Sequence, residues 1–561
     1  MKFTRRNAAF FMASGFGLTL NGGKTLFSAD VIPTFPCRDS LARADYRLLP
    51  KGSAARLLGD EIGGDFKFVK DASLYLARIP PLLRGVQTMI VPLFGDETGR
   101  SGAWVRLGHE HIRPEWFGSG RRGVDDAFAL QAAFDQIGRG GRRVFLSGQY
   151  VISRRVEIVG KKDFEVFGDG SIVAASSMPV RSDFQCLLVS DCQDFSIAGI
   201  TVDGNRRRRT PAETAAHAME LRSCRKYVLQ RLTLIDSVTD CLYIATASNE
   251  VGDISRHNQG AHLVDCRFEN GFRQGVSIIQ GRDIRFTRCR FAGTNGTPPA
   301  AGCDLESNER DVEGAIRNII FEDCIFENSA GYGLLVGSAR KPNSIDVRNC
   351  RFVNNRKGAV SWNGDRGRLI DCSFEGFDGA IAERGLIDIG ASPKAGGLSV
   401  VRPAFSSLRN QDPGHPLLYV HRLSKGQVRM DGARSVSASH IVNFRADDCQ
   451  ISGGQFIATD ASAFAFSGAR GSMTETEIQA EGYPCVRVSG DDCHIEGCEL
   501  IGGLPSVDGP LIQWNGKGGG IRDTTFVASG RAGAAVKFGR GARASMSGNS
   551  VAGFAAVHFG I

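Results

Sequence analysis

Two carboxyl groups stand two residues apart near the middle of the chain, within the segment Ala301-Gly302-Cys303-Asp304-Leu305-Glu306. Side chains two apart on a β-strand project from the same face, separated by roughly 6.5–7 Å. Carboxyl groups near that separation can act as acid and base in glycosidic-bond hydrolysis, at the lower edge of the inverting range. Asp304 and Glu306 are therefore candidate catalytic residues, and Asp240 with Asp304 is an alternative pair.

The strands that would position these residues are copies of one short pattern. In each copy a small residue is followed by an apolar residue, any residue and a second apolar residue. The small residue stands at 218, 241, 275, 302, 333, 358 and 379, so successive copies lie 23, 34, 27, 31, 25 and 21 residues apart. A short minimum interval with insertions is typical of a repeat solenoid, whose strands stack on their neighbours.

Alternation within each copy distinguishes an inward face from an outward one. We expect the apolar residues to face the interior and the residue between them to face solvent. The outward positions form one column across successive strands: Glu220, Tyr243, Ser277, Asp304 and Leu335.

Neighbouring strands lie about 4.8 Å apart, which would place Tyr243 and Ser277 close to Asp304. Arg273, one position before the copy that contains Gln274, also alternates outward and would flank the group. Arg273 joins the catalytic candidates, and Tyr243, Ser277 and Gln274 are predicted to bind the substrate.

Polar insertions in the repeat are predicted to form loops on either side of this column. The two longest intervals contain the stretches 248–260 and 307–314, and insertions on a solenoid commonly form loops that border a binding groove. His257 in the first stretch and Asn295 in the run Thr294-Asn295-Gly296-Thr297 are further predicted substrate-binding residues.

The same groups leave other chemistry open. A lyase or uronate epimerase would need a base beside the sugar carboxylate and a cation to neutralise it, roles open to Arg273, Tyr243, His257 or Lys357. The acidic residues could instead hold Ca²⁺. In a purely structural protein these charges would be solvated surface, and His217 is expected to be a hydrogen-bonded turn residue.

The composition of the chain limits the kinds of molecule that it is expected to bind. The net charge of +8 over 561 residues comes from scattered Lys and Arg, which argues against nucleic-acid binding. The fifteen cysteines include no CxxC pair and no zinc-like spacing. Five of them begin Cys-x-Phe triplets at equivalent repeat positions, and we expect buried thiol ladders without a metal. These are Cys266, Cys289, Cys324, Cys350 and Cys372.

The N-terminal residues divide into two expected segments. Residues 1–29 combine Arg5-Arg6 with an apolar run and a small-residue exit, and they resemble a twin-arginine export signal. Nothing else in the chain is long and apolar enough to span a bilayer. Residues 30–112 lack the repeat and are expected to form a small β-rich module.

Residues 113–152 are the segment that indicates the fold class most clearly. Asp125 or Asp126 can cap a short amphipathic helix, glycines end it, and an alternating strand begins at Val144. Such a helix would cover the open end of the solenoid.

The pattern Trp116-Phe117-Gly118, Gly123-Val124-Asp125-Asp126 and Val144-x-Leu146-x-Gly148-x-Tyr150 resembles the opening of pectate-lyase-superfamily β-helices. Ser147 stands where that pattern usually has proline. The resemblance covers about residues 113–561, and residues 30–112 resemble the modules that precede the solenoid in tailspike-like proteins. The triplets typical of polygalacturonases, Asn-Thr-Asp, Gly-His-Gly and Arg-Ile-Lys, do not occur at the repeat positions.

We therefore expect an all-β protein, a right-handed single-stranded parallel β-helix over 113–561 with a short N-terminal capping helix and a small β-rich module. The signal-like residues 1–29 imply an exported, periplasmic or extracellular protein. The β-helix resemblance implies that it cleaves or modifies an extended polysaccharide, acidic polymers included, as a lyase or glycoside hydrolase. The alternative is a non-catalytic carbohydrate-binding protein or tailspike-like adhesin. No cofactor other than Ca²⁺ and no stable membrane insertion are expected, and a homotrimer is left open.

Overall fold

The computed structural model describes most of the chain and divides it into two compact units, one ending at Ser119 and one beginning at Gly120. The predicted export signal, residues 1–29, lies outside the described residues, as do the repeat copy at 378–382 and the glycines at 123, 140 and 141. The described ranges are 32–45, 47, 54–58, 63–77, 87–107, 111–120, 125–138, 143–181, 183–210, 216–247, 249–337, 342–376, 385–390, 396–406, 416–422, 424, 427–438, 440–459, 462–481, 484–502 and 510–559.

The N-terminal unit is built on a five-stranded sheet in the order β1-β2-β3-β5-β4. The strands are β1 (Thr34–Phe35), β2 (Ala54–Leu57), β3 (Gly64–Val69), β4 (Ile90–Pro92) and β5 (Ala103–Arg106), joined by helices α2 (Arg38–Ala42) and α3 (Ser73–Leu76) and by the 3₁₀ helix η3 (Pro114–Phe117). Its core packs Leu41, Phe66, Val91 and Trp104, all fully buried. This unit contains none of the predicted site residues.

The second unit opens with helix α4 (Ala127–Asp135), whose apolar face is buried. Asp125 accepts hydrogen bonds from the Ala127 and Ser153 amides, and Asp126 accepts from the Gly120 and Val151 amides. The two aspartates thus tie the start of the helix to the first coil. The predicted helix is confirmed, although Asp126 at its N-cap makes no side-chain capping bond.

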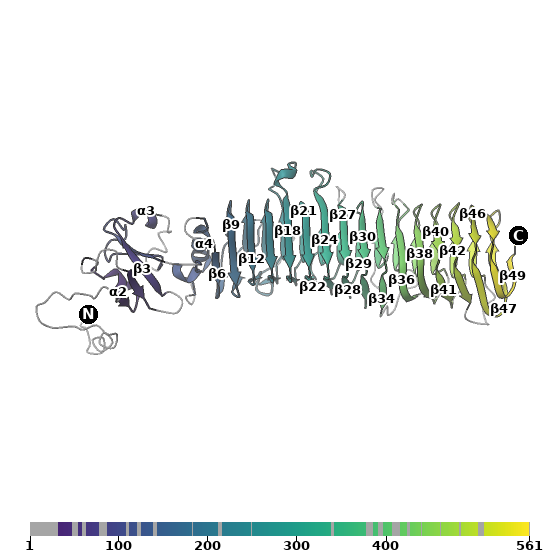
Figure 1. The fold of residues 1–561 in the computed structure, drawn as a ribbon, viewed down its shortest axis with the longest axis horizontal. Coiled ribbons are helices and arrows are strands. Elements are labelled where there is room, and N and C mark those ends of the chain that lie inside the picture. The colour runs from purple at the N-terminus through teal and green to yellow at the C-terminus, as the bar shows by residue number, and fades with distance from the viewer. Residues whose placement is uncertain are drawn as a thin grey trace, which may run out of the picture. The chain divides into compact units, whose positions relative to one another are not determined.

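The remaining chain forms a parallel β-helix whose strands pair with their equivalents in the next coil (Figure 1). A representative coil contains β14 (Met219–Arg222), β15 (Arg225–Gln230) and β16 (Thr233–Ile235), which pair with β17, β18 and β19. All three pairings are parallel, as expected for a solenoid. The predicted fold class is confirmed.

Three families of strands follow from this arrangement. The first, which carries the predicted site, contains β8 (Val156–Val159), β11 (Leu187–Ser190), β14, β17 (Leu242–Ala245), β20 (Val276–Ile278), β23 (Cys303–Leu305), β26 (Tyr332–Val336), β29 (Gly358–Trp362), β32 (Ile387–Ile389), β35 (Leu418–Val420), β37 (Val442–Phe444), β39 (Phe464–Phe466), β42 (Val486–Val488) and β45 (Ile512–Trp514). The second contains β6 (Arg143–Leu146), β9 (Lys162–Gly168), β12 (Gln193–Ala198), β15, β18 (Asn258–Val264), β21 (Gly281–Thr287), β24 (Ile316–Glu322), β27 (Asn343–Arg348), β30 (Gly367–Ile370) and β33 (Leu398–Val401). The third contains β7 (Gln149–Ile152), β10 (Ser171–Ala174), β13 (Thr201–Asp203), β16, β19 (Arg267–Glu269), β22 (Arg290–Ala292), β25 (Ile325–Glu327), β28 (Arg351–Val353), β31 (Ser373–Glu375) and β34 (Ala404–Ser406).

The C-terminal coils complete the solenoid. Their strands are β36 (Arg429–Ala438), β38 (Gln450–Ala458), β40 (Ser472–Thr474), β41 (Glu477–Ala480), β43 (His494–Glu496), β44 (Glu499–Gly502), β46 (Lys517–Arg522), β47 (Thr525–Phe538), β48 (Arg543–Ser547) and β49 (Ser550–Phe559). Four of these strands, β36, β38, β47 and β49, have nine or more residues. Parallel pairing continues through the stretch in which the sequence period was least clear, because β32, β35 and β37 pair in order.

Ladders of identical side chains fill the interior. Phenylalanine rings of successive coils stack with centroids 4.6–5.3 Å apart, at positions 268, 291, 326, 352, 374 and 405. All fifteen cysteines are free thiols, and all except Cys37 are buried. The predicted thiol ladder is confirmed, and its sulfhydryls donate to backbone carbonyls, as Cys266 does to Leu229.

Short polar residues make the turns that end the third family of strands. Asp236, Asn270, Asn328 and Asn354 adopt positive φ there, a backbone region that costs Asp and Asn less than most residues. Gly293 occupies the same position in one coil, where an added Cβ would lie 2.6 Å from Asn270 Oδ1. Repetition of these turns keeps successive coils in register.

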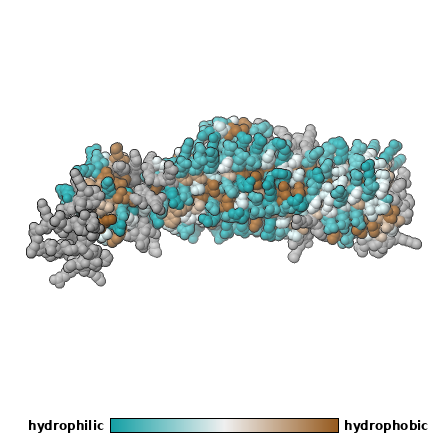
Figure 2. All heavy atoms as spheres, viewed as in Figure 1, coloured by the Kyte–Doolittle hydropathy of each residue, from teal (hydrophilic) through white to brown (hydrophobic). Residues whose placement is uncertain are grey.

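Hydrophilic side chains cover most of the face shown in Figure 2, with apolar patches between them. Among the described residues, no helix has the length and apolar character needed to cross a bilayer.

Candidate functional site

The predicted outward residues lie in exact register on the first family of strands. Glu220 of β14 pairs with Tyr243 of β17, Tyr243 with Ser277 of β20, and Ser277 with Asp304 of β23. The same pairing continues from Asp304 to Leu335 of β26. We call this succession the outer column, and its predicted alignment is confirmed.

The expected solvent exposure of the outer column is wrong for its polar members. Glu220 is 3% exposed, and Ser277 and Asp304 are each 1% exposed. Tyr243 is partly exposed. Side chains three positions earlier in the repeat contact the outer column: Asp240 accepts from Ser277, Gln274 donates to Asp304, and the His217 ring stacks on Tyr243. Strand alternation alone does not describe these contacts. These residues, His217, Asp240 and Gln274, form the flanking column.

Asp240 is the centre of the upstream part of the cluster. Its carboxylate accepts two hydrogen bonds from Arg273, at 2.9 Å from Nε and 2.7 Å from Nη2, and one from Ser277 Oγ at 3.0 Å. Asp240 is fully buried. Burial alone would lower the pKa of Arg273, but the hydrogen bonds and charge of Asp240 outweigh it and raise that pKa. The predicted catalytic residues Asp240 and Arg273 thus form a bidentate ion pair, in which Asp240 is fully buried and Arg273 is partly exposed.

Asp304 occupies a different environment. Its Oδ2 accepts from Gln274 Nε2 at 2.7 Å, and Gln274 Oε1 accepts from the Ala301 amide at 2.8 Å. Its Oδ1 is buried, with no hydrogen-bond partner in the described part of the chain. Burial, followed by the charges of Glu306 and Asp240, raises the pKa of Asp304 well above its usual range. Asp304 therefore keeps its proton at pH values where an exposed aspartate is ionised.

Glu306 lies immediately after β23 and is exposed. Its amide donates to the Ile278 carbonyl at 3.0 Å, which fixes the backbone beside the preceding coil. The predicted carboxyl pair thus consists of a buried group with a raised pKa and an exposed group that a solute can reach.

His217 belongs to the cluster, although the sequence indicated only a turn residue. Its ring stacks on Tyr243 with centroids 4.2 Å apart and planes 3° apart. Its Nδ1 lies 3.1 Å from Thr239 Oγ1 and 3.5 Å from Asp240 Oδ2. Burial lowers the pKa of His217 and raises that of Tyr243, so both rings are held neutral. His217 occupies the same repeat position as Asp240 and Gln274, and this shared position could have identified it as a site residue from the sequence.

Glu220 anchors the upstream end of the cluster. Its Oε1 accepts two hydrogen bonds from Arg222, at 2.8 Å and 2.6 Å, and its Oε2 accepts from Gln185 Nε2 at 2.6 Å. Glu220 was recognised in the sequence only as an outward position. Gln185 is distant in sequence and gave no signal.

The two insertion loops are joined through one buried side chain. Gln280 Oε1 accepts from the Thr246 amide at 2.9 Å, and Gln280 Nε2 donates to Asp311 Oδ1 at 2.7 Å. Asp311 also accepts from the Asn308 amide at 2.6 Å. The loops after β17 and β23 therefore form one connected edge, and both project from the solenoid in Figure 1.

The remaining predicted binding residues lie apart from the carboxyl pair. His257 is 1% exposed, and its Nε2 lies 3.0 Å from the Val251 carbonyl within its own loop, which contains the 3₁₀ helix η5 (Ile254–Arg256). Asn295 is exposed in the turn before β23, where Arg206 Nη2 donates to its Oδ1 at 2.7 Å. Asn295 thus lies at the opposite ends of the strands from His257.

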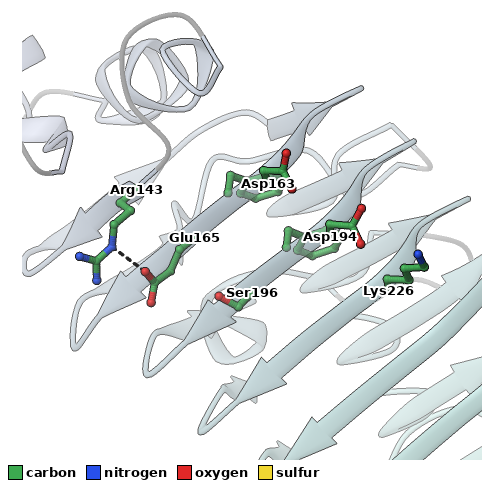
Figure 3. A pocket seen from close by; sticks show the side chains of 8 residues that line it. Arg143, Asp163, Glu165, Asp194, Ser196 and Lys226 are labelled. Atoms are coloured by element: carbon green, nitrogen blue, oxygen red, sulfur yellow. Dashed lines mark hydrogen bonds and ion pairs between the residues drawn. The ribbon is translucent and has the colours of Figure 1, made fainter.

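Two surface hollows lie on the second family of strands and contain no outer-column residue. One, of about 390 Å³, is lined by Arg143, Asp163, Glu165, Asp194 and Lys226 among others, with Arg143 paired to Glu165 at 2.6 Å (Figure 3). The other, of about 450 Å³, includes His262, Asp283 and Arg285. In the described ranges, no group of three or more His, Cys, Asp or Glu is placed to hold a metal ion.

Comparison with known proteins adds information about the fold. Residues 185–376 match the family model described as the right handed beta helix region. No curated protein matches the sequence. The chain is similar in structure to tailspike protein 2 of bacteriophage CBA120, with 9% identity and a TM-score of 0.38 over 82% of this chain and 56% of that chain. It therefore spans little more than half the length of that protein.

Two further solved structures are similar. One is tailspike protein gp49 of Acinetobacter baumannii bacteriophage Fri1, a capsular polysaccharide depolymerase, with 12% identity and a TM-score of 0.47 over 81% of this chain and 75% of that chain. The other is PfbA, a surface adhesin of Streptococcus pneumoniae, with 12% identity and a TM-score of 0.37 over 80% of this chain and 93% of that chain. At such identities and TM-scores these likenesses carry no argument about activity. The parallel coils show that the chain is a right-handed parallel β-helix, the fold that the family model over residues 185–376 describes.

Proposed function

We propose that this protein binds an extended polysaccharide along the outer column and hydrolyses its glycosidic bonds beside Glu306. The observation that carries the proposal is the contrast between Asp304 and Glu306. Asp304 is buried and has a raised pKa, whereas Glu306 is exposed and close enough for its charge to act on Asp304. A carboxyl group with a raised pKa beside a second carboxyl group is the arrangement used for proton transfer to a leaving sugar oxygen.

The proposed roles follow from which groups a substrate can reach. Glu306 donates a proton to the glycosidic oxygen as the bond between that oxygen and the anomeric carbon breaks, and water adds to the anomeric carbon. The proton that the water loses returns to the Glu306–Asp304 pair, in which Asp304 is the buried proton store. Tyr243 and Arg273, both partly exposed, contact the sugar on the upstream side. The hydrogen bonds of Arg273 to Asp240 hold its guanidinium in one orientation, so little ordering is needed on binding.

The ion pairs favour hydrolysis over lyase or epimerase chemistry. A lyase needs a cation whose charge is available to neutralise the sugar carboxylate. The charge of Arg273 is offset by Asp240, and the charge of Arg222 is offset by Glu220. This side-chain set suits a neutral polymer, whose hydroxyl groups need hydrogen bonds rather than net charge.

A carbohydrate-binding surface without catalysis is the second candidate. Asp240 and Asp304 are 0% and 1% exposed, as expected if their function is to hold neighbouring side chains in place. The proposed context is the same for both candidates: an exported protein with a signal at 1–29, a module at 30–112 and the β-helix at 113–561.

The test uses purified protein, a panel of neutral polymers such as dextran and amylose, and acidic polymers such as alginate and polygalacturonate. Hydrolysis releases reducing ends without the ultraviolet absorbance of an unsaturated uronate, and E306Q should lose at least about 100-fold in rate, the scale of acid–base catalysis. E496Q, which changes an exposed carboxyl on β43 outside the outer column, is the matched control and should keep the wild-type rate.

Three results would contradict the proposal in different ways. An unsaturated product would establish a lyase. Binding without product for every polymer would support the carbohydrate-binding surface. Equal rates for E306Q and wild type would remove Glu306 from the reaction.

A further inference from the structure

The outer column becomes polar again beyond Leu335. Leu335 pairs with Ser361 of β29, Ser361 with Asp388 of β32, and Asp388 with Tyr419 of β35. Ser361, Asp388 and Tyr419 are 7%, 5% and 9% exposed. A second group of polar side chains therefore lies on the same face as Asp304, displaced along the solenoid axis.

This second group is organised by two tyrosines. Tyr332 reaches across the coils to donate from its hydroxyl to Asp388 Oδ2 at 3.3 Å. Gly358 leaves room for this ring, because an added Cβ would lie 2.9 Å from Tyr332 Cε1. Arg445 donates from Nη1 to the Tyr419 hydroxyl at 3.4 Å, and its guanidinium carbon lies 5.9 Å from the centroid of that ring. We call Tyr332, Asp388, Tyr419 and Arg445 the second cluster.

Together with the neighbouring Ser361, the second cluster contains the same kinds of group as the site around Asp304: a buried carboxyl, a tyrosine, a serine and an arginine. The arginines differ. Arg273 is bound by the Asp240 carboxylate, whereas Arg445 is exposed and its described hydrogen bond goes to a neutral phenol. Arg445 thus presents a guanidinium at the surface, held over the buried Tyr419 ring, and a guanidinium donates hydrogen bonds of the kind that bind sugar hydroxyls.

The spacing of the two groups fits one extended ligand. Asp388 lies three coils beyond Asp304, Tyr419 four and Arg445 five, so the displacements run from roughly 14 Å to roughly 24 Å at the usual spacing of strands. A polymer that contacts Glu306 and continues along the outer column would reach the second cluster. Two contacts on one chain raise the affinity for long chains far more than for short ones.

From these contacts we infer that the second cluster is a distal saccharide-binding subsite, which holds the polymer several sugar units away from Glu306. The inference rests on the proposed function, since it assumes that the outer column binds polysaccharide. If the inference is right, the affinity rises with the length of the saccharide chain, and changing Arg445 and Tyr419 reduces that rise.

The experiment measures binding by calorimetry on the E306Q background, which prevents cleavage. The probes are size-fractionated oligosaccharides of whichever panel polymer the protein binds, from two sugar units to chains longer than five coils. Affinity should rise with length until both groups are spanned. R445A should lose roughly 10-fold of that gain, and Y419F/R445A should lose more.

The control and the outcomes separate the two proposals. Arg543 is exposed on β48, outside the outer column and the second cluster, so R543A should bind as the parent does. If the parent binds no polymer, the proposed function fails. If the parent binds long chains more tightly and R445A and Y419F/R445A keep the full gain, the outer column binds saccharide and the distal subsite is disproved.

Discussion

Asp304 and Glu306 are two residues apart in sequence but lie in opposite environments. Asp304 lies within β23, beside the flanking column, and Gln274 donates a hydrogen bond to one of its oxygens. Glu306 follows the end of β23 and is exposed to solvent. The pKa of Asp304 is therefore raised because Asp304 is buried, while its neighbour Glu306 is exposed. The prediction that follows concerns the proton on Asp304.

In the folded protein Asp304 keeps a proton that the unfolded chain releases above about pH 4. The folded state therefore loses stability as the pH rises from there toward the raised pKa of Asp304. Each unit of difference between the two pKa values is worth about 1.4 kcal/mol. D304N exchanges no proton, so its Tm relative to wild type should increase between about pH 4 and about pH 8.

Melting curves of both proteins across that range check this prediction. D194N, which replaces an exposed aspartate on β12, controls for loss of a carboxyl group elsewhere. A Tm difference between D304N and wild type that is the same at every pH would mean that Asp304 is ionised in the folded protein.

Among the loops and strands, the connection through Gln280 is the feature that sequence patterns did not reveal. The insertions after β17 and β23 are separated by more than forty residues, yet a single amide bonds to both. The edge of the proposed binding face is thus one unit, and movement of either loop disturbs the other.

Replacing Gln280 with alanine should release both loops together. The Thr246 amide and the buried Asp311 carboxylate would each lose a partner, at a cost of about 1–3 kcal/mol per group. Hydrogen exchange should increase in residues 246–257 and 307–314 alike. Q259A removes an exposed glutamine of β18 as the control, and protection lost in only one loop would show that the two are independent.

Over the whole β-helix, stability is expected to be distributed coil by coil, because each coil packs mainly on its neighbours. The stacked phenylalanines connect the coils most directly. Phe326 lies 4.6 Å from Phe291 and 4.8 Å from Phe352, measured between ring centroids. Damage to this ladder should therefore remain local.

F326A should cost about 3–5 kcal/mol by opening a cavity in the ladder. Hydrogen exchange should rise in the coils that contain β22, β25 and β28 and change little in β42 to β46. F326L, which retains most of the volume, is the conservative control. A uniform rise along the solenoid would instead indicate one cooperative unit.

The repeat by itself determined the fold and the alignment of the outer column. A strand period of two and a small residue in every copy leave parallel stacking as the way to bury the apolar positions, so Glu220, Tyr243, Ser277 and Asp304 had to align. The buried Cys and Phe ladders follow for the same reason.

Only the tertiary structure decided which polar groups are buried and which are partners. Alternation gives a direction away from the core but says nothing about the neighbouring column, whose Asp240 and Gln274 bond to Ser277 and Asp304. The contacts of Glu220 with Gln185 and of Gln280 with both loops join residues tens of positions apart. Such pairings depend on the stacking of coils and the length of side chains, which no local pattern specifies.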